Sequence, residues 1–363
     1  MTLDDLKTPC ALVDIDAVEW NTQRMSERMS KLGVRLRPHV KTHKCVEAAR
    51  LQVRGHFGGI TVSTLAEARF FKDAGFGDIT YAFPLPPDRA GEAAALGVNV
   101  VVDHEAAVAA IEASGKRMRV FLEIDCGDRR AGVDPERPES VELARRIAKS
   151  QDFAGVLTHA GHSYDCKSAE KIRAVAKQER DVAVRFAARL REAGIAVREV
   201  SVGSTPTMSL AEDLKGVTEA RPGNFVFYDA FQAAIGSCTL DDCAFSVLAT
   251  VAGQYRRENK LIVTAGALAL SKDRGARHVD PNCGYGVVGT ADGKRLPDLR
   301  VTDLSQEHGQ IVATAPMDVG HFPVGSRLRI IPNHACLAAA QHDRYFVVRG
   351  KQVVAEWKPC RGW

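Results

Sequence analysis

The sequence has no apolar run of the ~18 residues that a membrane-spanning helix requires. Its first five residues, MTLDD, are acidic and carry no apolar signal core. Neither sign of charge dominates, because 49 lysines and arginines face 45 aspartates and glutamates and leave a formal charge of +4 over 363 residues. A global basic face for nucleic acid is therefore not expected, although a local anion site remains open. We expect a cytoplasmic protein that binds neither a membrane nor nucleic acid.

Paired cysteines are also missing. The nine cysteines are an odd number, none of them forms a Cys-x-x-Cys pair, and most lie in apolar segments. This pattern favours reduced thiols in a cytosolic enzyme over a disulfide-bonded secreted domain. No internal repeat of about 20 to 50 residues and no low-complexity tract is evident.

What the sequence does contain, from Ala11 to about Val226, is a regular alternation of short β-branched runs with amphipathic segments. The alternation predicts a parallel sheet with right-handed crossovers. Eight or so such units in about 220 residues fit a closed (β/α)8 barrel better than an open sheet. The expected strands are residues 11–13, 34–40, 59–63, 78–82, 99–102, 119–124, 153–159 and 197–202, with 224–227 as a further candidate.

The pattern changes after Gly236, where strand-like runs follow one another through Gly and Pro turns with no helix of comparable length between them. We therefore expect two domains, a (β/α)8 barrel over residues 1–236 and a mainly antiparallel β domain over residues 237–363. The expected strands of the second domain are residues 244–251, 260–268, 299–304, 326–331 and 345–348.

The stretch RPHVKTHK, residues 37–44, gathers four cationic or titratable side chains around Lys41 at a strand-to-helix connection. In α/β folds this edge carries the chemistry. Neighbouring cations disfavour the ammonium form of a lysine, and the neutral amine is the form that adds to a carbonyl group. The alternative interpretation is a solvated basic loop, or a contact to phosphate or nucleic acid.

Two further strand ends carry polar clusters. The segment DCGDRRAG, residues 125–132, has two adjacent arginines that can bind an anion or a ring nitrogen, or else pair with Asp125 or Asp128 on the surface. The segment HAGHSY, residues 159–164, can hydrogen-bond and stack, but either of its histidines can equally be structural. Both segments are expected at the same edge of the barrel as Lys41.

Gly203, Ser204 and Thr205 end another predicted strand, and a glycine with two hydroxyl side chains before a helix suits a phosphate-binding nest. A helix N-cap explains Ser204 or Thr205 without any ligand. Further donors lie at the last candidate barrel strand, in RPGNFVFY, residues 221–228.

In the second domain, His334 and Cys336 place an imidazole and a thiol two residues apart, on one face if the backbone is extended. That spacing can chelate Zn²⁺, but a structural zinc site needs four protein ligands, and no second pair is obvious. A metal here would be open to water or substrate. Glu307 or His308 can contribute a ligand nearby, although a turn with solvated charges explains both.

In their order along the chain, these motifs are similar to those of one family. The chain resembles the metal-activated pyridoxal-phosphate enzymes with the alanine-racemase-like fold, the group of D-serine dehydratase and D-threonine aldolase. The resemblance spans nearly the whole chain, and its most distinctive segments are RPHVKTHK and PNHAC. The motifs that carry it are residues 8–14, 37–44, 125–132, 161–164, 203–207 and 332–336.

The resemblance implies a role for each candidate residue. Lys41 would hold pyridoxal 5'-phosphate covalently, and His334 and Cys336 would bind a divalent metal, which the soft thiolate favours as Zn²⁺ over Mn²⁺. The other implied cofactor contacts are Gly203, Ser204 and Thr205 at the phosphate, Tyr164 beside the cofactor and Arg130 on the pyridine side. A homodimer is also implied, with the β domain of one chain near the barrel rim of the other.

The implied reaction is a dehydration of a β-hydroxy-D-amino acid such as D-serine or D-threo-3-hydroxyaspartate. Lys41 removes the Cα proton, the metal polarises the β-hydroxyl, and the products are a 2-keto acid and ammonia. Three alternatives remain open: cleavage between Cα and Cβ to glycine and an aldehyde, racemisation without a metal, and non-catalytic binding of the cofactor. The His/Cys form of the metal pair favours the dehydratase branch.

Overall fold

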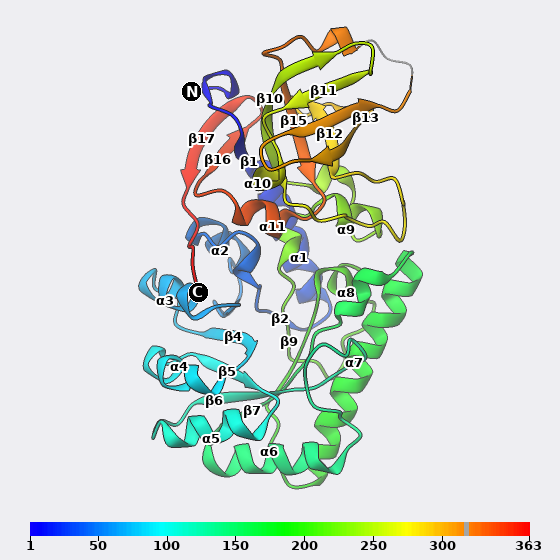
Figure 1. Ribbon diagram of the computed structural model, residues 1–363. Coiled ribbons are helices and arrows are strands. Elements are labelled where there is room, and N and C mark those ends of the chain that lie inside the picture. Colours follow the sequence, from blue (N-terminus) through cyan, green and yellow to red (C-terminus); the bar gives the residue numbers. More distant parts are fainter. Residues whose placement is uncertain (316–318) are drawn as a thin grey trace. The chain divides into compact units, whose positions relative to one another are not determined.

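An eight-stranded parallel sheet is the core of the unit formed by Gln23–Gly223 and Cys360–Trp363 (Figure 1). The computed structural model describes residues 1–315 and 319–363. A parallel bridge between His39 and Thr61 joins the two ends of the sheet, so the strands close into a barrel. In spatial order the strands are β2 (Arg35–Leu36), β9 (Glu219–Ala220), β8 (Glu199–Val202), β7 (Asp152–Leu157), β6 (Arg119–Glu123), β5 (Asn99–Val102), β4 (Ile79–Pro84) and β3 (Ile60–Val62).

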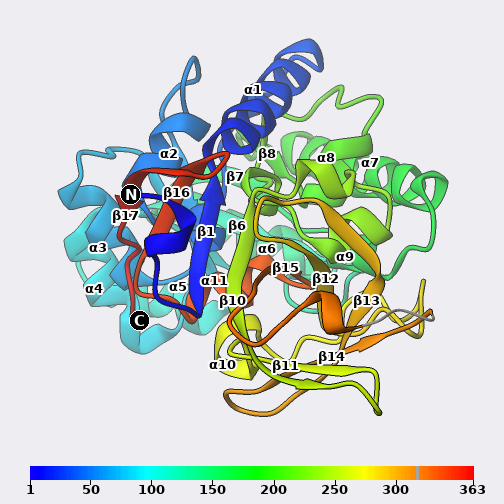
Figure 2. The same cartoon turned by 90° about the horizontal axis from the view of Figure 1, so that it is seen from above.

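Helices connect these strands and lie around them (Figure 2). Three of them begin at hydroxyl caps: Thr64 accepts a hydrogen bond from the N–H of Glu67, Ser168 from the N–H of Lys171, and Ser204 from the N–H of Thr207. None of the described helices is both long and apolar enough to cross a membrane. The helices are α1 (Ile15–Lys31), α2 (Val46–Gln52), α3 (Leu65–Asp73), α4 (Ala90–Leu96), α5 (Glu105–Ala113), α6 (Pro138–Ser150), α7 (Ala169–Glu192) and α8 (Thr205–Leu210).

The other unit, Met1–Thr22 with Asn224–Pro359, contains a nine-stranded sheet. Strands β10 and β11 pair directly as well as through the four strands between them, so six antiparallel strands form a closed barrel. The strands, in spatial order, are β11 (Lys260–Val263), β14 (Gly309–Ala313), β13 (Arg295–Leu304), β12 (Gly286–Thr290), β15 (Arg327–Pro332), β10 (Phe245–Tyr255), β1 (Cys10–Asp14), β16 (Tyr345–Arg349) and β17 (Gln352–Trp357).

The predicted fold class, a (β/α)8 barrel followed by an antiparallel β domain, is confirmed, but two strand assignments were wrong. Residues 11–13 do not begin the barrel, because they form β1, which pairs with β10 and β16. Residues 224–227 are not a strand either; Asn224–Val226 form a 3-10 turn, and the last barrel strand is β9. The compact units divide the chain after Gly223, whereas the sequence predicted a domain boundary after residue 236.

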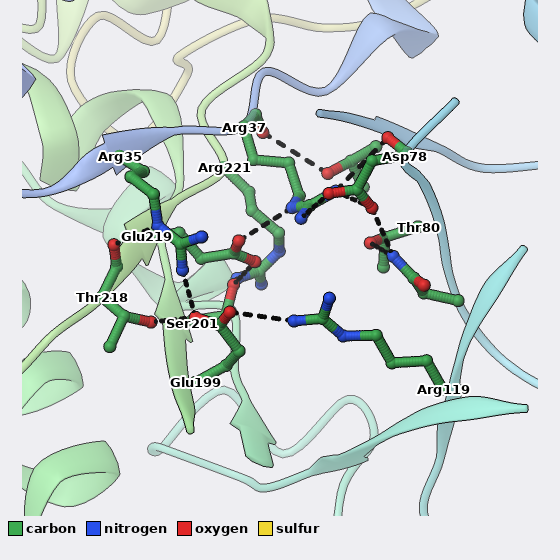
Figure 3. A network of polar contacts seen from close by, with 12 residues as sticks. Arg35, Arg37, Asp78, Thr80, Arg119, Glu199, Ser201, Thr218, Glu219 and Arg221 are labelled. Atoms are coloured by element: carbon green, nitrogen blue, oxygen red, sulfur yellow. Dashed lines mark hydrogen bonds and ion pairs between the residues drawn. The ribbon is translucent and has the colours of Figure 1, made fainter. Parts of the chain in front are cut away.

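A network of charged and polar side chains joins strands β2, β6, β8 and β9 of the parallel barrel (Figure 3). Arg37 is 1% exposed and donates to Glu219 over 2.8 Å and to Asp78 over 2.7 Å. Glu219, which is fully buried, also accepts a hydrogen bond from Ser201 over 2.7 Å, and Ser201 accepts one from Arg221 over 2.6 Å. Two arginines are therefore connected to one buried carboxylate.

Replacing this carboxylate tests its contribution to stability. Glu219→Gln leaves the buried charge of Arg37 with only the partly exposed Asp78 as a partner, and removing one member of a buried pair costs about 3–5 kcal/mol. We expect urea unfolding at neutral pH to show a loss of this size. The matched control, Glu92→Gln, removes the carboxylate that pairs with the exposed Arg69 and Arg89 and should cost less than about 1 kcal/mol per pair. Equal losses in the two variants would contradict the assignment.

Candidate active site

Lys41 lies in the 3-10 turn Val40–Thr42 at the carboxyl end of β2, and its side chain is exposed. Backbone hydrogen bonds hold the preceding residues on both sides: the N–H of Thr61 donates to Pro38 O over 2.9 Å, and the N–H of His39 donates to Pro222 O over 3.0 Å. The amine is therefore presented from a backbone that the neighbouring strands β3 and β9 fix in place.

The residues that follow Lys41 are structural. His43 is fully buried; its Nε2 lies 2.8 Å from Gln52 Oε1, and burial lowers its pKa to about 4. The ammonium of Lys44 pairs over 2.9 Å with Glu67, which is buried. The second lysine of RPHVKTHK thus has a fixed ionic partner within the protein.

His39 and His159 lie near Lys41 at the carboxyl ends of the parallel strands. We call this end of the barrel its mouth. Burial lowers the pKa of His39 well below its usual value, and the charges of Lys41 and Arg221 lower it further. Burial acts in the same way on the pKa of His159, reinforced by Arg130 and Lys41. Both imidazoles are therefore neutral at neutral pH, and the positive charge of the mouth is carried by one lysine and two arginines.

The predicted residues Arg130 and Tyr164 belong to the same mouth. The Tyr164 and His159 rings have their centroids 6.5 Å apart. The Arg130 side chain is 57% exposed, and its Nε lies 3.8 Å from Asp128 Oδ2. The pairing of Arg130 with Asp128, one of the alternatives from the sequence, is thus present. The charge of Arg130 also lowers the pKa of His159, so the guanidinium lies near the mouth.

Arg221 is the arginine that the sequence did not assign to the site. Its guanidinium is buried and donates to Thr158 O and to Ser201 Oγ, each over 2.6 Å. Burial lowers its pKa, and the nearby carboxylates Glu219, Glu179 and Glu123 oppose this effect. The signal available in the sequence was an arginine directly after the last barrel strand, where inward-facing side chains meet the mouth.

Gly203, Ser204 and Thr205 form a buried turn between β8 and α8. Gly203 has φ +125°, and a Cβ there would lie 2.9 Å from the backbone nitrogen of Arg221. Ser204 caps α8 through the N–H of Thr207, as the structural alternative predicted, and the Thr205 hydroxyl accepts from the N–H of Gly223 over 3.3 Å.

Glu179, on α7, holds this turn from behind. Its fully buried carboxylate accepts hydrogen bonds from the N–H groups of Ala160 and Gly203 and from the hydroxyl of Thr207, at 3.0, 2.8 and 2.9 Å. Burial raises the pKa of Glu179. It also raises the pKa of Glu123, at the end of β6, to about 7. Both carboxyl groups are thus harder to ionise than exposed glutamates.

These features fit pyridoxal phosphate. An exposed amine suits its aldehyde, a cationic mouth suits its phosphate, and a glycine at position 203 allows a close approach to the backbone. The role of Gly203, Ser204 and Thr205 at the phosphate remains a prediction.

The predicted metal pair lies in the antiparallel unit. His334 has extended backbone and caps α11 (Ala335–Ala340), whereas Cys336 lies in the first turn of this helix and not in the extended segment considered from the sequence. The Nδ1 atom of His334 is 3.0 Å from Asp273 Oδ2, and Asn224 Nδ2 is 3.6 Å from the sulfur of Cys336. Burial lowers the pKa of His334, but its hydrogen bonds to Asp273 and Cys336 outweigh burial and raise it to about 11.

An imidazole whose Nδ1 faces a carboxylate is the usual form of a histidine metal ligand, so the pair fits a divalent cation that displaces the proton. Within the described residues no group of three or more His, Cys, Asp or Glu side chains could hold a metal. A cation on this pair would keep positions open to water or substrate. Glu307 and His308 are exposed in the turn between β13 and β14. This agrees with the interpretation of the two residues as a turn with solvated charges.

Comparisons with known proteins cover both units. Residues 13–230 match the alanine racemase N-terminal domain, and residues 244–348 match a serine dehydratase domain. The chain is 41% identical to D-threo-3-hydroxyaspartate dehydratase of Delftia sp., over 100% of this chain and 99% of the relative. It is 37% identical to D-serine dehydratase of Dictyostelium discoideum, over 99% and 98%. Identity to the D-threonine aldolase of Arthrobacter sp. is 27%, over 97% and 91%.

The solved structure of the Delftia enzyme has a TM-score of 0.95 with this chain and covers all of both chains at 41% identity. Two variants of that enzyme have also been solved, one with a histidine replaced by alanine and one, in a metal-free form, with alanine in place of a cysteine two positions further on. With these matches along its whole length, the chain belongs to the fold-type III pyridoxal-phosphate enzymes of the D-serine dehydratase and D-threonine aldolase family, which are lyases acting on D-amino acids.

Proposed function

We propose that the protein is a pyridoxal-phosphate- and zinc-dependent lyase that removes the β-hydroxyl of a β-hydroxy-D-amino acid as water, giving a 2-keto acid and ammonia. The observation that carries this proposal is the adjacent imidazole and thiol of His334 and Cys336. They repeat the spacing of the histidine and cysteine replaced in the Delftia dehydratase.

Lys41 is the proposed covalent anchor and the proposed base. Pyridoxal phosphate, when bound, supplies an aldehyde that captures the substrate amine and a ring that accepts the electrons released at Cα. The Lys41 amine would act as the base that removes the Cα proton of the substrate.

The remaining residues of the mouth bind and orient. Gly203, Ser204 and Thr205 are proposed to hold the phosphate, and Tyr164 to lie beside the ring. Arg130 is proposed for the pyridine side, where an arginine discourages protonation of the ring nitrogen. Arg221 is a second arginine of the mouth, and its buried, hydrogen-bonded guanidinium makes it the more rigid of the two.

His334 and Cys336 are proposed to hold the divalent cation, and the thiolate favours Zn²⁺ over Mn²⁺. The cation would supply Lewis acidity, which makes a β-hydroxyl a better leaving group. The homodimer and the cytoplasmic location remain predictions.

The products decide between elimination and the retro-aldol alternative. Incubated with D-serine, D-threonine or D-threo-3-hydroxyaspartate, the purified enzyme should release a 2-keto acid and an equal amount of ammonia. The keto acid is measured by its reduction with a dehydrogenase, and glycine is measured separately by chromatography. Glycine with an aldehyde as the main product would refute the dehydratase assignment, and formation of the L-amino acid alone would indicate a racemase.

Metal removal tests whether a cation on His334 and Cys336 takes part in the reaction. EDTA should suppress turnover and added Zn²⁺ should restore it. His334→Ala and Cys336→Ala should each lower kcat/KM roughly 100- to 1000-fold, because Lewis-acid assistance is worth several kcal/mol. His308→Ala, in an exposed turn of the same domain, should leave the rate unchanged. Full activity of the chelated enzyme would exclude a catalytic metal.

A further inference from the structure

The imidazole of His334 has a carboxylate partner on one nitrogen. Its Nδ1 lies 3.0 Å from Asp273 Oδ2, and the two side chains are 38% and 27% exposed. An imidazole can hydrogen-bond with one nitrogen and ligate a metal with the other. With Nδ1 turned to Asp273, the atom of His334 that can reach a cation is Nε2.

Asp273 is itself held in position by its own loop. The N–H of Gly275 donates to its Oδ1 over 2.8 Å, and its own N–H donates to the hydroxyl of Ser271 over 3.3 Å. Oδ1 therefore organises the loop, while Oδ2 faces His334. The two oxygens of one carboxylate have separate tasks.

The loop is also bound to the residue that precedes His334. The side-chain amide of Asn333 donates to the carbonyl oxygens of Asp273 and Gly284, over 3.1 and 2.8 Å. Gly275 has φ +64°, and a Cβ at this position would come within 2.6 Å of Asn333 Cγ. The close approach of loop and strand end thus needs a glycine, and it places Asp273 beside His334 before any ligand is bound.

A second carboxylate, that of Asp229, supports His334 and Cys336 by binding the backbone between them. Asp229 is 1% exposed, and its Oδ2 accepts hydrogen bonds from the N–H of Ala335 over 2.9 Å and from Asn224 Nδ2 over 2.8 Å. Asn224 also approaches the sulfur of Cys336. Asp229 therefore fixes the start of α11 through the backbone, whereas Asp273 contacts the His334 ring itself.

We propose that Asp273 is a positioning residue that keeps the proton of the His334 ring on Nδ1 and so makes Nε2 the metal-binding atom. The inference rests on the proposed function, because it requires a cation on His334 and Cys336. A carboxylate behind a histidine ligand fixes the ring and raises its basicity, and losing such a partner weakens metal binding by about 10- to 100-fold.

The alternative is that Asp273 only caps its loop, and Asp273→Asn separates the two roles. An asparagine retains an oxygen for the N–H of Gly275, so the loop cap survives. Its amide N–H group would face Nδ1, which then has to accept, and the ring proton moves to Nε2. A capping role predicts normal metal binding in Asp273→Asn, whereas the positioning role predicts a defect comparable to that of Asp273→Ala.

The test is a Zn²⁺ affinity measurement on full-length enzyme that retains its cofactor but has been stripped of metal. Zn²⁺ is titrated in competition with a chromophoric chelator, with no substrate present. Asp273→Asn and Asp273→Ala should both bind Zn²⁺ about 10- to 100-fold more weakly than the wild type. Asp280→Asn, which alters a similar cap on the N–H of Asn282 in the same loop, should bind normally.

The melting temperature of each metal-stripped variant reports on the loop, and Asp273→Asn should melt close to the wild type. If Asp273→Asn binds Zn²⁺ with wild-type affinity, the positioning role is wrong, even if Asp273→Ala binds Zn²⁺ weakly. His334→Ala distinguishes this failure from failure of the proposed function. If His334→Ala binds Zn²⁺ as tightly as the wild type, the metal site itself is wrong and the inference falls with it.

Discussion

The buried ion pair between Arg37 and Glu219 is the constraint on which the catalytic face of the parallel barrel depends. Both side chains are at most 1% exposed, so neither charge can rely on water. Glu219 meets this requirement for two cations, Arg37 directly and Arg221 through Ser201. A barrel interior filled with apolar side chains would need no such compensation, but it could not hold a rigid guanidinium beneath the mouth.

The charge of the mouth follows from this arrangement. Burial lowers the pKa values of His39 and His159, the charges of Lys41, Arg130 and Arg221 lower them further, and burial raises the pKa values of Glu123 and Glu179. The lysine and the arginines of the mouth can attract an anionic cofactor. The metal pair has the opposite electrostatics, with Asp273 on the ring of His334 and Asp229 on the backbone behind it.

Much of this was accessible from the sequence. The alternation of strands and helices predicted the parallel barrel, and the rule that chemistry gathers at carboxyl strand ends placed Lys41, Gly203 and the two arginine-bearing segments at one edge. Pairings between residues that are distant in the sequence could not be predicted. Cys10–Asp14 reads as a first barrel strand by composition, but its partners are β10 and β16, and β9 contains too few residues for any periodic signal.

The same limit applies to the site. Asp273 is 61 residues from His334 in the sequence, and Asp229 is 106 residues from Ala335, so no spacing rule connects them. Lys44 pairs with Glu67 and His43 lies beside Gln52, partners that lie further along the chain and come together with them in the fold. Motif composition identified the segment that contains Lys41, and the tertiary structure assigns Lys44 to an ion pair with the buried Glu67.

The most direct test of this account is to locate the cofactor on the chain. The purified enzyme is reduced with borohydride, which makes a covalent link between pyridoxal phosphate and a lysine permanent, and the digested protein is analysed by fragment-ion mass spectrometry. The account predicts the added mass on Lys41 and an unmodified Lys44. The added mass on Lys44 or on another lysine, or its absence from an enzyme that is active with D-serine, would contradict it.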